Sequence, residues 1–446
     1  MEFEVLKRSH LKRNMVIVLV VVAIISAIVL NFTQAKYKLT ESIPIVNGTV
    51  NYKRPDLNVV AMYQQDESGE YVNIDTVPTS GYALNTELSV CGQSVDGEIV
   101  KDESIPITYE NGRVYIGINT KGTKCYLYFD EQKGPLLNET ILTGKDIQER
   151  LDFSTVLSTN TNGIIYRETT DEGTTYYFAG DTDENWVSYA GHYWRVIRIN
   201  EDGSIRMIYN GTTTDQTGST TQCTTSTFDS SYNNNMYVGY MYTSNQVHGL
   251  GTDSTIKGVI DGWYEVNILD TEYEQYVSTE AGFCGDRMPY SRSGSSGSYT
   301  YTSGGGTGST ETYYGAYTRL NTNNAADVNP TLECTNSSDL YTVAESSQGN
   351  HALDYPIGLI TADEAAYAGG VYSTNNSGYY LYTNSTYWTM SPYSFNGSFA
   401  GVFRVGGNGR LGYIVDDTYG VRPVINLRSD VTVSSGDGTS NNPYQI

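Results

Sequence analysis

The stretch from residue 354 to residue 428 constrains the fold of this chain most, because it marks both ends of a helix. Thr361 and Glu364 form a capping box, in which the Thr hydroxyl and the Glu carboxylate each accept a backbone N–H that the first helical turn leaves unpaired. Gly369 and Gly370 then end the helix, since glycine readily adopts the positive φ found after a last helical turn.

A turn sequence after the helix predicts a β-hairpin. Residues 406–409 read Gly-Gly-Asn-Gly, which tolerates positive φ and permits a tight reversal. The flanking segments 402–405 and 410–415 are the expected strands. We expect this hairpin to be displayed at the surface, and Thr361, Glu364, Trp388 and Arg422 to belong to its scaffold.

An apolar, charge-free run over residues 15–32 predicts a membrane anchor, because its length approaches the ~20 residues of a helical span. Residues 33–35 are a poor cleavage site, so a signal peptide is the alternative. The positive-inside tendency places the basic tail, residues 1–14, in the cytoplasm and everything after Lys36 outside. The sequence therefore predicts a single-pass protein of the cell membrane whose bulk is extracellular.

Charge and composition restrict the partners of this extracellular part. With 27 basic and 50 acidic residues the net charge is −23, which disfavours nucleic acid. The chain has 40 tyrosines and 45 glycines but few charges, a composition typical of contact surfaces because Tyr offers rigid area at low entropic cost. Secreted β-rich proteins share this composition without binding anything.

The 446 residues suggest two or three domains. Short β segments and an Asn-Gly turn at 111–112 predict a small, sandwich-like β-rich spacer over residues 37–134. A linker is expected at 135–165 and a binding domain at 166–446. Within that domain, residues 291–309 are rich in Gly, Ser, Thr and Tyr, and predict a flexible loop that buries too little apolar surface to order itself.

Further elements are expected after the spacer. Residues 144–153 predict a short helix, and residues 255–269 predict a core helix capped by Asp253 or Ser254. A strand, a turn and a strand follow one another between residues 186 and 209. Three arginines are expected on the outer face of this hairpin: Arg195, Arg198 and Arg206.

Five cysteines fit an exported protein, because no two of them form a metal-type C-x-x-C pair. Local pairing predicts the disulfides Cys91–Cys125 and Cys284–Cys334. Cys223 is then a free thiol or an intermolecular link. Because sequence does not determine connectivity, five reduced cysteines stay an alternative.

No catalytic constellation stands out, so we expect no enzyme activity and no cofactor. His192 lies in an apolar strand, where a structural role is favoured. Asp181, Asp183 and Asn185 repeat at a calcium-loop spacing, but Trp186 stands where such a loop needs glycine. A solvated acidic turn is favoured there, and calcium is the one metal left open.

The candidate ligand contacts surround the predicted hairpin. Aromatic faces stack on sugars and act as hot spots in protein interfaces, and Tyr393, Phe399 and Tyr413 are the aromatic residues expected to be exposed. The full set of expected contact residues is Tyr393, Ser394, Asn396, Phe399, Arg404, Asn408, Arg410, Tyr413, Asp416 and Asp417.

Residues 358–370 resemble the Arg-Leu-Pro-Thr-Glu helix motif of formylglycine-generating-enzyme-like domains, and residues 388–392, 402–405 and 421–423 follow in that family's order. The resemblance implies a C-type-lectin-like α+β fold with its ends together and a loop-rich ligand face. Enzymes of the family use a cysteine pair, and this chain has no cysteine after Cys334. The succession of anchor, β unit and this ending also resembles surface proteins of gut Gram-positive bacteria.

The binding branch of that family includes variable proteins of diversity-generating retroelements, whose mutated positions exclude Lys, Glu, Gln, Met and Trp. Residues 391–428 contain none of these five types. Hypervariation explains this, and so does chance in a short stretch rich in Gly, Val and Tyr.

Three functions follow from these observations. The favoured one is an adhesive surface protein that binds an extracellular protein or glycan through its lectin-like domain. The alternatives are an enzyme of the formylglycine-generating or cell-wall-acting kind, and a structural subunit of a surface appendage.

Overall fold

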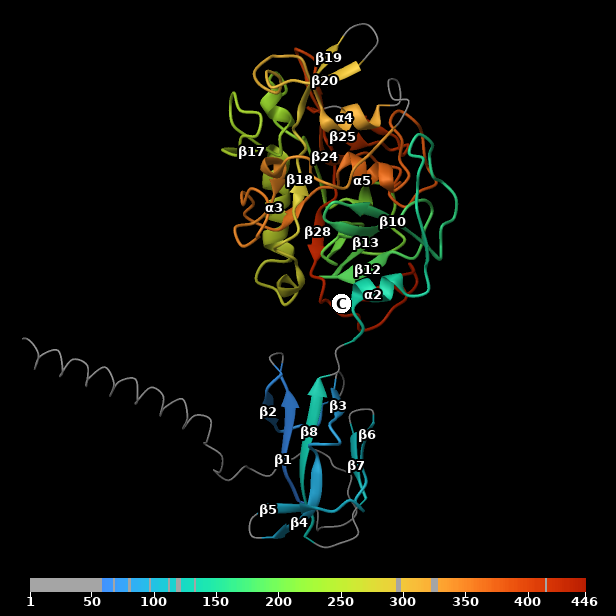
Figure 1. The fold of residues 1–446 in the computed structure, drawn as a ribbon, viewed down its shortest axis with the longest axis vertical. Helices are drawn as coiled ribbons and strands as arrows, with labels where there is room; N and C mark the ends of the chain where they lie inside the picture. The colour runs from blue at the N-terminus through green and yellow to red at the C-terminus, as the bar shows by residue number, and fades with distance from the viewer. Residues whose placement is uncertain are drawn as a thin grey trace, which may run out of the picture. The chain divides into compact units, whose positions relative to one another are not determined.

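The computed structural model describes residues 58–66, 69–78, 82–95, 98–110, 113–117, 122–131, 134–293, 298–321, 328–413 and 415–446. The predicted basic tail and membrane anchor lie outside these residues. No helix within the described ranges is long and apolar enough to cross a membrane. The chain divides into two compact units, Met1–Lys133 and Gly134–Ile446, which are described one at a time (Figure 1).

The described part of the first unit consists of β-strands. They are β1 (Asn58–Gln65), β2 (Tyr71–Ile74), β3 (Tyr82–Leu84), β4 (Val90–Val95), β5 (Glu98–Lys101), β6 (Ile107–Glu110), β7 (Arg113–Ile116) and β8 (Lys124–Glu131). One sheet has the order β2-β1-β8-β4-β5 with β3 also on β8, and β6 and β7 form a separate hairpin. Strand alternation along β8 buries Cys125, Leu127 and Phe129. The β6–β7 hairpin packs Tyr109 and Val114 against this core.

Two disulfides join cysteines that are local to each unit. Cys91 on β4 lies opposite Cys125 on β8 and is bonded to it. In the second unit Cys284 is bonded to Cys334, and Cys223 is free. The structure thus holds both pairs that the spacing predicts.

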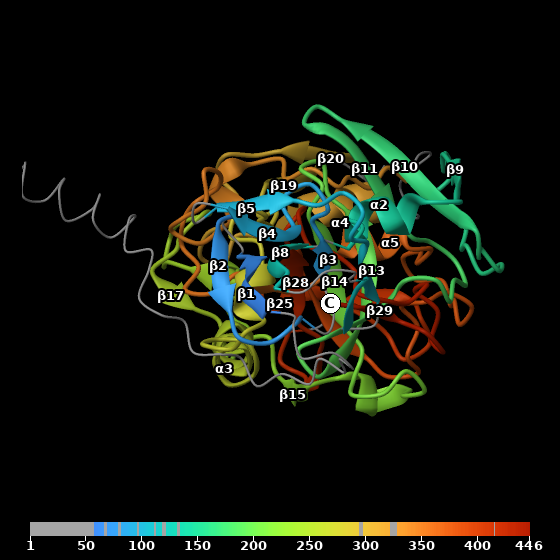
Figure 2. The ribbon, with the colours of Figure 1, turned by 90° about the horizontal axis from the view of Figure 1, so that it is seen from below.

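The larger sheet of the second unit has the order β23-β28-β14-β13-β11-β10-β9, with β12 between β13 and β29. In Figure 2 the long β10–β11 hairpin runs along the edge of this unit, with β9 beside β10. The strands are β9 (Asp146–Gln148), β10 (Ile164–Thr170), β11 (Gly173–Tyr177), β12 (Trp186–Tyr189), β13 (His192–Ile199), β14 (Ile205–Tyr209), β23 (Ile357–Gly358), β28 (Val424–Leu427) and β29 (Tyr444–Gln445).

The second sheet of this unit has the order β15-β27-β24-β21-β19-β20, with β25 joining β24 to β26. Its strands are β15 (Thr224–Ser226), β19 (Pro289–Ser293), β20 (Ser298–Tyr301), β21 (Thr312–Tyr314), β24 (Tyr387–Phe395), β25 (Ala400–Val405), β26 (Leu411–Tyr413) and β27 (Tyr419–Val421). Two short pairs complete the described strands: β16 (Met241–Tyr242) with β17 (Thr252–Asp253), and β18 (Phe283–Cys284) with β22 (Leu340–Tyr341).

The described helices of the second unit are short apart from one. They are α2 (Leu137–Leu142), α3 (Thr255–Asn267), α4 (Gly315–Leu320) and α5 (Ala362–Tyr367), with 3₁₀ turns at Gly218–Thr221, Asn235–Val238, Glu274–Tyr276 and Ser337–Asp339. The described chain is therefore mainly β with few helices, which agrees with the predicted α+β class in its coarse sense. Figure 1 shows α4 and α5 beside β24 and β25, next to the hairpin that the sequence singled out.

The predicted helix and hairpin are confirmed. The Thr361 hydroxyl accepts from the N–H of Glu364, the Glu364 carboxylate accepts from the N–H of Thr361, and α5 begins at the next residue. Gly369 follows the helix at a φ of 121°. β25 and β26 pair antiparallel around the glycine-rich turn. The core helix is confirmed as α3, with Ser254 as its N-cap.

The predicted linker is wrong, and so is the helix expected at 144–153. Leu137 and Ile141 of α2 are fully buried in the core of the second unit, so residues 134–165 belong to that unit. Residues 146–148 form β9, which pairs parallel with β10. Pairing with a strand edge outweighs the weak helical pattern of so short a segment.

The segment 291–309 is ordered where it is described, which corrects the expected loop. β19 and β20 form an antiparallel hairpin, and Gly305 and Gly306 are buried beyond it. Tyrosine supplies the apolar area that aliphatic residues do not. The ring of Tyr299 packs 5.0 Å from that of Tyr313 and 5.2 Å from that of Tyr317.

Candidate functional site

An open pocket lies at the turn of the β25–β26 hairpin. We call it the hairpin pocket, and its volume is about 430 Å³. It brings together three of the residues predicted as ligand contacts and residues from two other loops. Its lining consists of Tyr372, Ser373, Thr386, Arg404, Gly406, Gly407, Asn408 and Arg410.

The turn that forms one wall of this pocket is held by its own hydrogen bonds. The N–H of Gly406 donates to the carbonyl of Arg410 at 2.8 Å, and the N–H of Gly409 donates to the carbonyl of Gly406 at 2.7 Å. Gly409 has a φ of 78°, and a Cβ there would lie 1.6 Å from the carbonyl oxygen of Asn376. Only glycine fits that position, so the turn presents its residues from a fixed backbone.

Two neighbouring loops complete the wall. The N–H of Gly407 donates to the Thr386 hydroxyl at 3.0 Å, which ties the turn to the loop before β24. Asn408 donates from its side-chain amide to Asn375 at 2.7 Å. The Ser373 hydroxyl accepts from the guanidinium of Arg410 at 3.3 Å.

The pocket is positively charged. The Arg404 guanidinium lies over the ring of Tyr419, 4.6 Å from its centroid. Burial, followed by a hydrogen bond to Asp417, raises the pKa of Tyr419 to about 12, so this ring stays neutral beneath the cation. The Arg404 Nε is buried and has no hydrogen-bond partner in the described part of the chain. Among the described residues that line the pocket, no carboxylate accompanies Arg404 and Arg410.

The other predicted contact residues lie elsewhere. Asn396 and Phe399 are exposed at the turn between β24 and β25, where the Phe399 ring, 53 % exposed, stacks 5.2 Å from that of Tyr232. Asp416 and Asp417 are exposed but do not line the pocket. Tyr413 ends β26, and its side chain lies outside the described part of the structure.

Tyr393 and Ser394 are not accessible contacts, which corrects the prediction. They lie on β24, an interior strand between β21 and β25 whose residues are all buried. The exposed fraction of Tyr393 is 6 %, and its hydroxyl bonds that of Tyr372 at 2.9 Å. Tyr393 therefore supports the wall of the hairpin pocket from behind.

Residues of the pocket that sequence reasoning missed are Tyr372, Ser373 and Thr386. Tyr372 and Ser373 follow the end of α5, and Thr386 precedes β24. No pattern in the sequence marks them. The pairing of β24 with β25 carries Thr386 to the hairpin turn, and a bridge between Tyr372 and Leu411 carries the other loop there.

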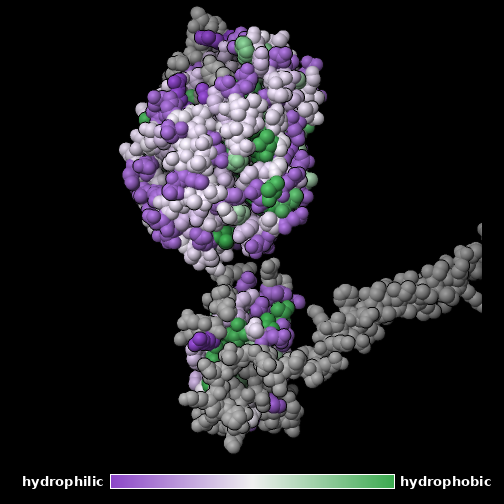
Figure 3. Space-filling view, turned by 180° about the vertical axis from the view of Figure 1, so that it is seen from behind, coloured by the Kyte–Doolittle hydropathy of each residue, from purple (hydrophilic) through white to green (hydrophobic). Residues whose placement is uncertain are grey.

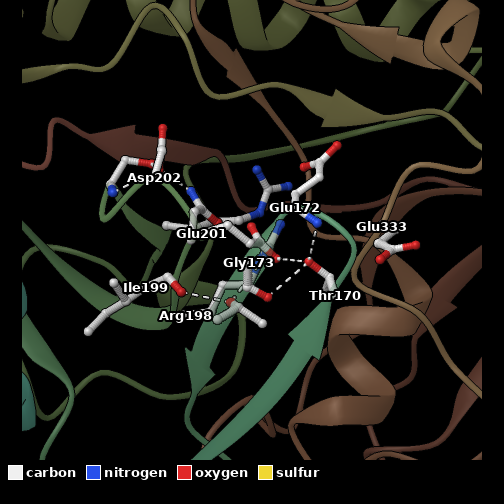
Figure 4. Close-up of polar contacts among 12 residues, drawn as sticks. Thr170, Glu172, Gly173, Arg198, Ile199, Glu201, Asp202 and Glu333 are labelled. Carbon is white, nitrogen blue, oxygen red and sulfur yellow. Dashed lines mark hydrogen bonds and ion pairs between the residues drawn. The ribbon is translucent and has the colours of Figure 1, made fainter.

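A second hollow of about 580 Å³ lies among α4, α5 and the β10–β14 strands. We call it the acid cleft after the eight carboxylates among its lining residues: Glu172, Glu201, Asp202, Glu280, Asp286, Glu333, Asp363 and Glu364. Figure 4 shows four of them around Thr170. The Thr170 hydroxyl accepts the N–H of Glu172 at 3.2 Å and donates to the carbonyl of Gly173 at 3.3 Å, so it holds the β10–β11 turn.

The prediction that Arg195, Arg198 and Arg206 lie on the outer face of their hairpin is wrong. Arg198 and Arg206 lie at the floor of the acid cleft. Arg206 is 2 % exposed, and its Nε lies 2.5 Å from the Glu364 carboxylate. Arg198 lies 3.5 Å from the same carboxylate and 3.3 Å from Glu201. Arg195 is also buried, where Asn185 accepts from its Nε at 2.6 Å. Glu364, which is distant in sequence, supplies the counter-charge that allows Arg206 to be buried.

The floor of the acid cleft is an ion-pair network. Besides Glu201 and Glu364, it includes Asp286 and Asp363, which both pair with Arg319 at 2.5 and 2.8 Å. A glycoside hydrolase needs two carboxylates that face a substrate across a gap. These four carboxylates face arginines instead, and the arrangement supports a structural role.

Asp183, one of the residues at the calcium-loop spacing, is already engaged. The side chain of Asp183 accepts from Trp186 Nε1 at 2.8 Å and from the Ser440 hydroxyl at 2.8 Å. A second acidic group, Asp253, Asp261 and Asp354, has ligand atoms within 4.8 Å of one another. The ammonium of Lys257 lies 3.2, 2.6 and 2.9 Å from these three carboxylates and occupies the position of a cation.

His192 has the surroundings of a structural histidine. Its Nε2 lies 3.2 Å from the amide oxygen of Asn267, and its ring lies 5.4 Å from that of Trp263. Burial lowers the pKa of His192, so the neutral ring is favoured.

Comparisons with known proteins assign no family to this chain. No family model, no curated protein and no solved structure matches it.

Proposed function

We propose that this chain is a membrane-anchored cell-surface protein that binds an extracellular protein or glycan through the hairpin pocket. The observation that carries the proposal is the meeting of Arg404, Asn408 and Arg410 in one open pocket on a rigid turn. Polar side chains held by a fixed backbone are what a preorganised binding site requires.

The surface chemistry supports recognition through polar groups. On the face drawn in Figure 3, the second unit is mainly hydrophilic with scattered hydrophobic spots. Large contiguous apolar patches mark obligate protein interfaces.

We also propose that the second unit has a C-type-lectin-like fold. Its first and last segments lie side by side, since the N–H of Leu137 donates to the carbonyl of Val431 at 2.8 Å and β12 pairs with β29. This closeness of the two ends, the capped α5 and the loop-rich pocket support the proposal, and Asn408 and Arg410 are its candidate hypervariable positions.

Binding assays on the full-length chain in lipid nanodiscs test the proposal. We expect signals on a glycan array or on a panel of host and bacterial cells. These signals fall in Arg404→Gln and Arg410→Gln and persist in Arg292→Gln, an exposed arginine on β19 outside the pocket. Absence of binding across both panels, or equal binding by all three variants, would count against the proposal.

Sequences of this chain from many isolates provide an independent test of hypervariation. Substitutions are expected to concentrate at Asn408, Arg410 and other exposed hairpin positions, while buried residues such as Trp388 and Arg422 stay constant. An even spread of substitutions over residues 391–428 would contradict hypervariation and leave the binding proposal in place.

A further inference from the structure

The charge of the hairpin pocket is opposite to that of the whole chain. The pocket carries Arg404 and Arg410 without a carboxylate among its described lining residues, on a chain of net charge −23. We infer that the ligand of this pocket is an acidic saccharide, in which a carboxylate on a sugar ring pairs with these two arginines. This inference rests on the proposed function and specifies its ligand class.

Arg404 is the expected anchor for the carboxylate. Its guanidinium is oriented by the Tyr419 ring at 4.6 Å, so less side-chain freedom is lost when a ligand binds. No described carboxylate forms an ion pair with Arg404, and its Nε lacks an acceptor. A planar guanidinium binds a carboxylate through two parallel hydrogen bonds. A bound carboxylate therefore supplies the counter-charge that Arg404 lacks.

The neutral groups of the pocket suit the hydroxyls of a sugar. The hydroxyls of Ser373 and Thr386 each accept one protein N–H, which leaves each O–H free to donate. Asn408 adds a further polar group, and Tyr372 adds an aromatic wall. Such a lining binds a ring with several hydroxyls better than a simple inorganic anion.

The size of the pocket favours a saccharide over a folded protein. A volume of about 430 Å³ lies within the range of small-molecule sites, which is about 300–1,000 Å³. A protein partner of ordinary affinity covers about 800 Å² of surface. A pocket at one hairpin turn is enough for one or two sugar rings.

The acid cleft provides an internal contrast. Its lining includes Glu172, Glu280 and Glu333, so it repels the carboxylate that the hairpin pocket attracts. An amino sugar, which is positively charged, would be attracted by the acid cleft and repelled by the hairpin pocket. The sign of the preferred ligand charge therefore distinguishes the two hollows.

The test compares ligands that differ in the charge and methylation of one carboxyl group. Sialyllactose and a galacturonate oligosaccharide are each measured beside their uncharged methyl esters, with full-length chain in nanodiscs. We expect at least one free acid to bind ten-fold or more tightly than its ester, and this preference to weaken as salt increases. Arg410→Gln and Arg404→Gln are expected to abolish the preference, Arg410→Lys to retain part of it, and Arg292→Gln to leave it unchanged.

The same set of variants distinguishes loss of binding at the hairpin pocket from loss of folding. Arg410 is exposed, so its substitution leaves the packing intact even if Arg404→Gln lowers the unfolding midpoint. Equal binding of acid and ester, failure of both acids to bind, or a preference that survives Arg410→Gln overturns the inference. So does stronger binding of chitosan oligosaccharides that is lost in Glu280→Gln. If both acids fail while cells still bind, the acidic-saccharide inference falls and the proposed function stands.

Discussion

Replacing Glu364 with glutamine is expected to destabilise the second unit by removing one buried charge and nothing else. Glu364 is 3 % exposed and pairs with Arg206 and Arg198. Glutamine keeps an oxygen that accepts the N–H of Thr361, and it is accepted at this position of a capping box. The contribution of the cap, about 1 kcal/mol, is thus retained.

The magnitude follows from the burial of the two cations. The exposed fraction of the Arg206 side chain is 2 % and that of Arg198 is 12 %. Loss of the Glu364 carboxylate therefore leaves Arg206 without a counter-charge where little water reaches it, while Arg198 keeps Glu201. Removing one partner of a buried ion pair costs about 3–5 kcal/mol. The matched control is Glu149→Gln. Its pair with Arg167 is 55 % and 51 % exposed, and such pairs contribute about 0–1 kcal/mol.

Urea unfolding followed by tryptophan fluorescence measures the effect. All four tryptophans, Trp186, Trp194, Trp263 and Trp388, lie in the second unit, so the signal reports on that unit alone. With a slope of about 3 kcal/mol per M, the urea midpoint falls by about 1–1.7 M. Adding Arg206→Met to Glu364→Gln is expected to restore part of the loss. A loss below about 1 kcal/mol, equal to that of Glu149→Gln, would refute the reasoning.

Three further predictions use the same unfolding assay or simple labelling. Cys284→Ser with Cys334→Ser lowers the free energy of unfolding by about 4 kcal/mol, because the disulfide closes a separation of 50 residues; an unchanged urea midpoint contradicts this. Lys257→Met leaves three carboxylates unpaired and lowers the free energy of unfolding by about 3 kcal/mol. Millimolar calcium restores part of that loss in the variant, and a calcium-dependent midpoint in the wild type would show that the ammonium does not fill the cation position. Burial raises the pKa of the Cys223 thiol to about 12, so native protein at pH 8 reacts with iodoacetamide roughly a thousandfold more slowly than an ordinary thiol; fast labelling before unfolding contradicts this.

Local sequence signals were reliable where neighbours in the chain supply the interaction. The α5 capping box involves residues three positions apart, and the Ser254 cap of α3 works in the same way. The hairpin turn depends on glycine conformation within four residues. These features require no knowledge of the tertiary fold.

Three of the eight residues that line the hairpin pocket were predicted from the sequence as ligand contacts. Arg404, Asn408 and Arg410 were predicted because they flank or form the turn. The prediction that Tyr393 is exposed was wrong, because residue alternation along β24 does not reveal that both faces of this strand are covered. Tyr372 and Thr386 carry no local signal, and they join the pocket only through strand pairing.

The sequence by itself determined the capped helix and the glycine-turned hairpin, because each rests on steric or hydrogen-bonding rules within a short segment. The tertiary structure alone decided that Arg206 is buried, that Arg198 is largely covered and that residues 134–165 join the second unit. A charge is buried only when a counter-charge reaches it, and Glu364 reaches Arg206 from a distant part of the chain. The same kind of long-range packing brings Tyr372 and Thr386 to the pocket in which the hairpin places its two arginines.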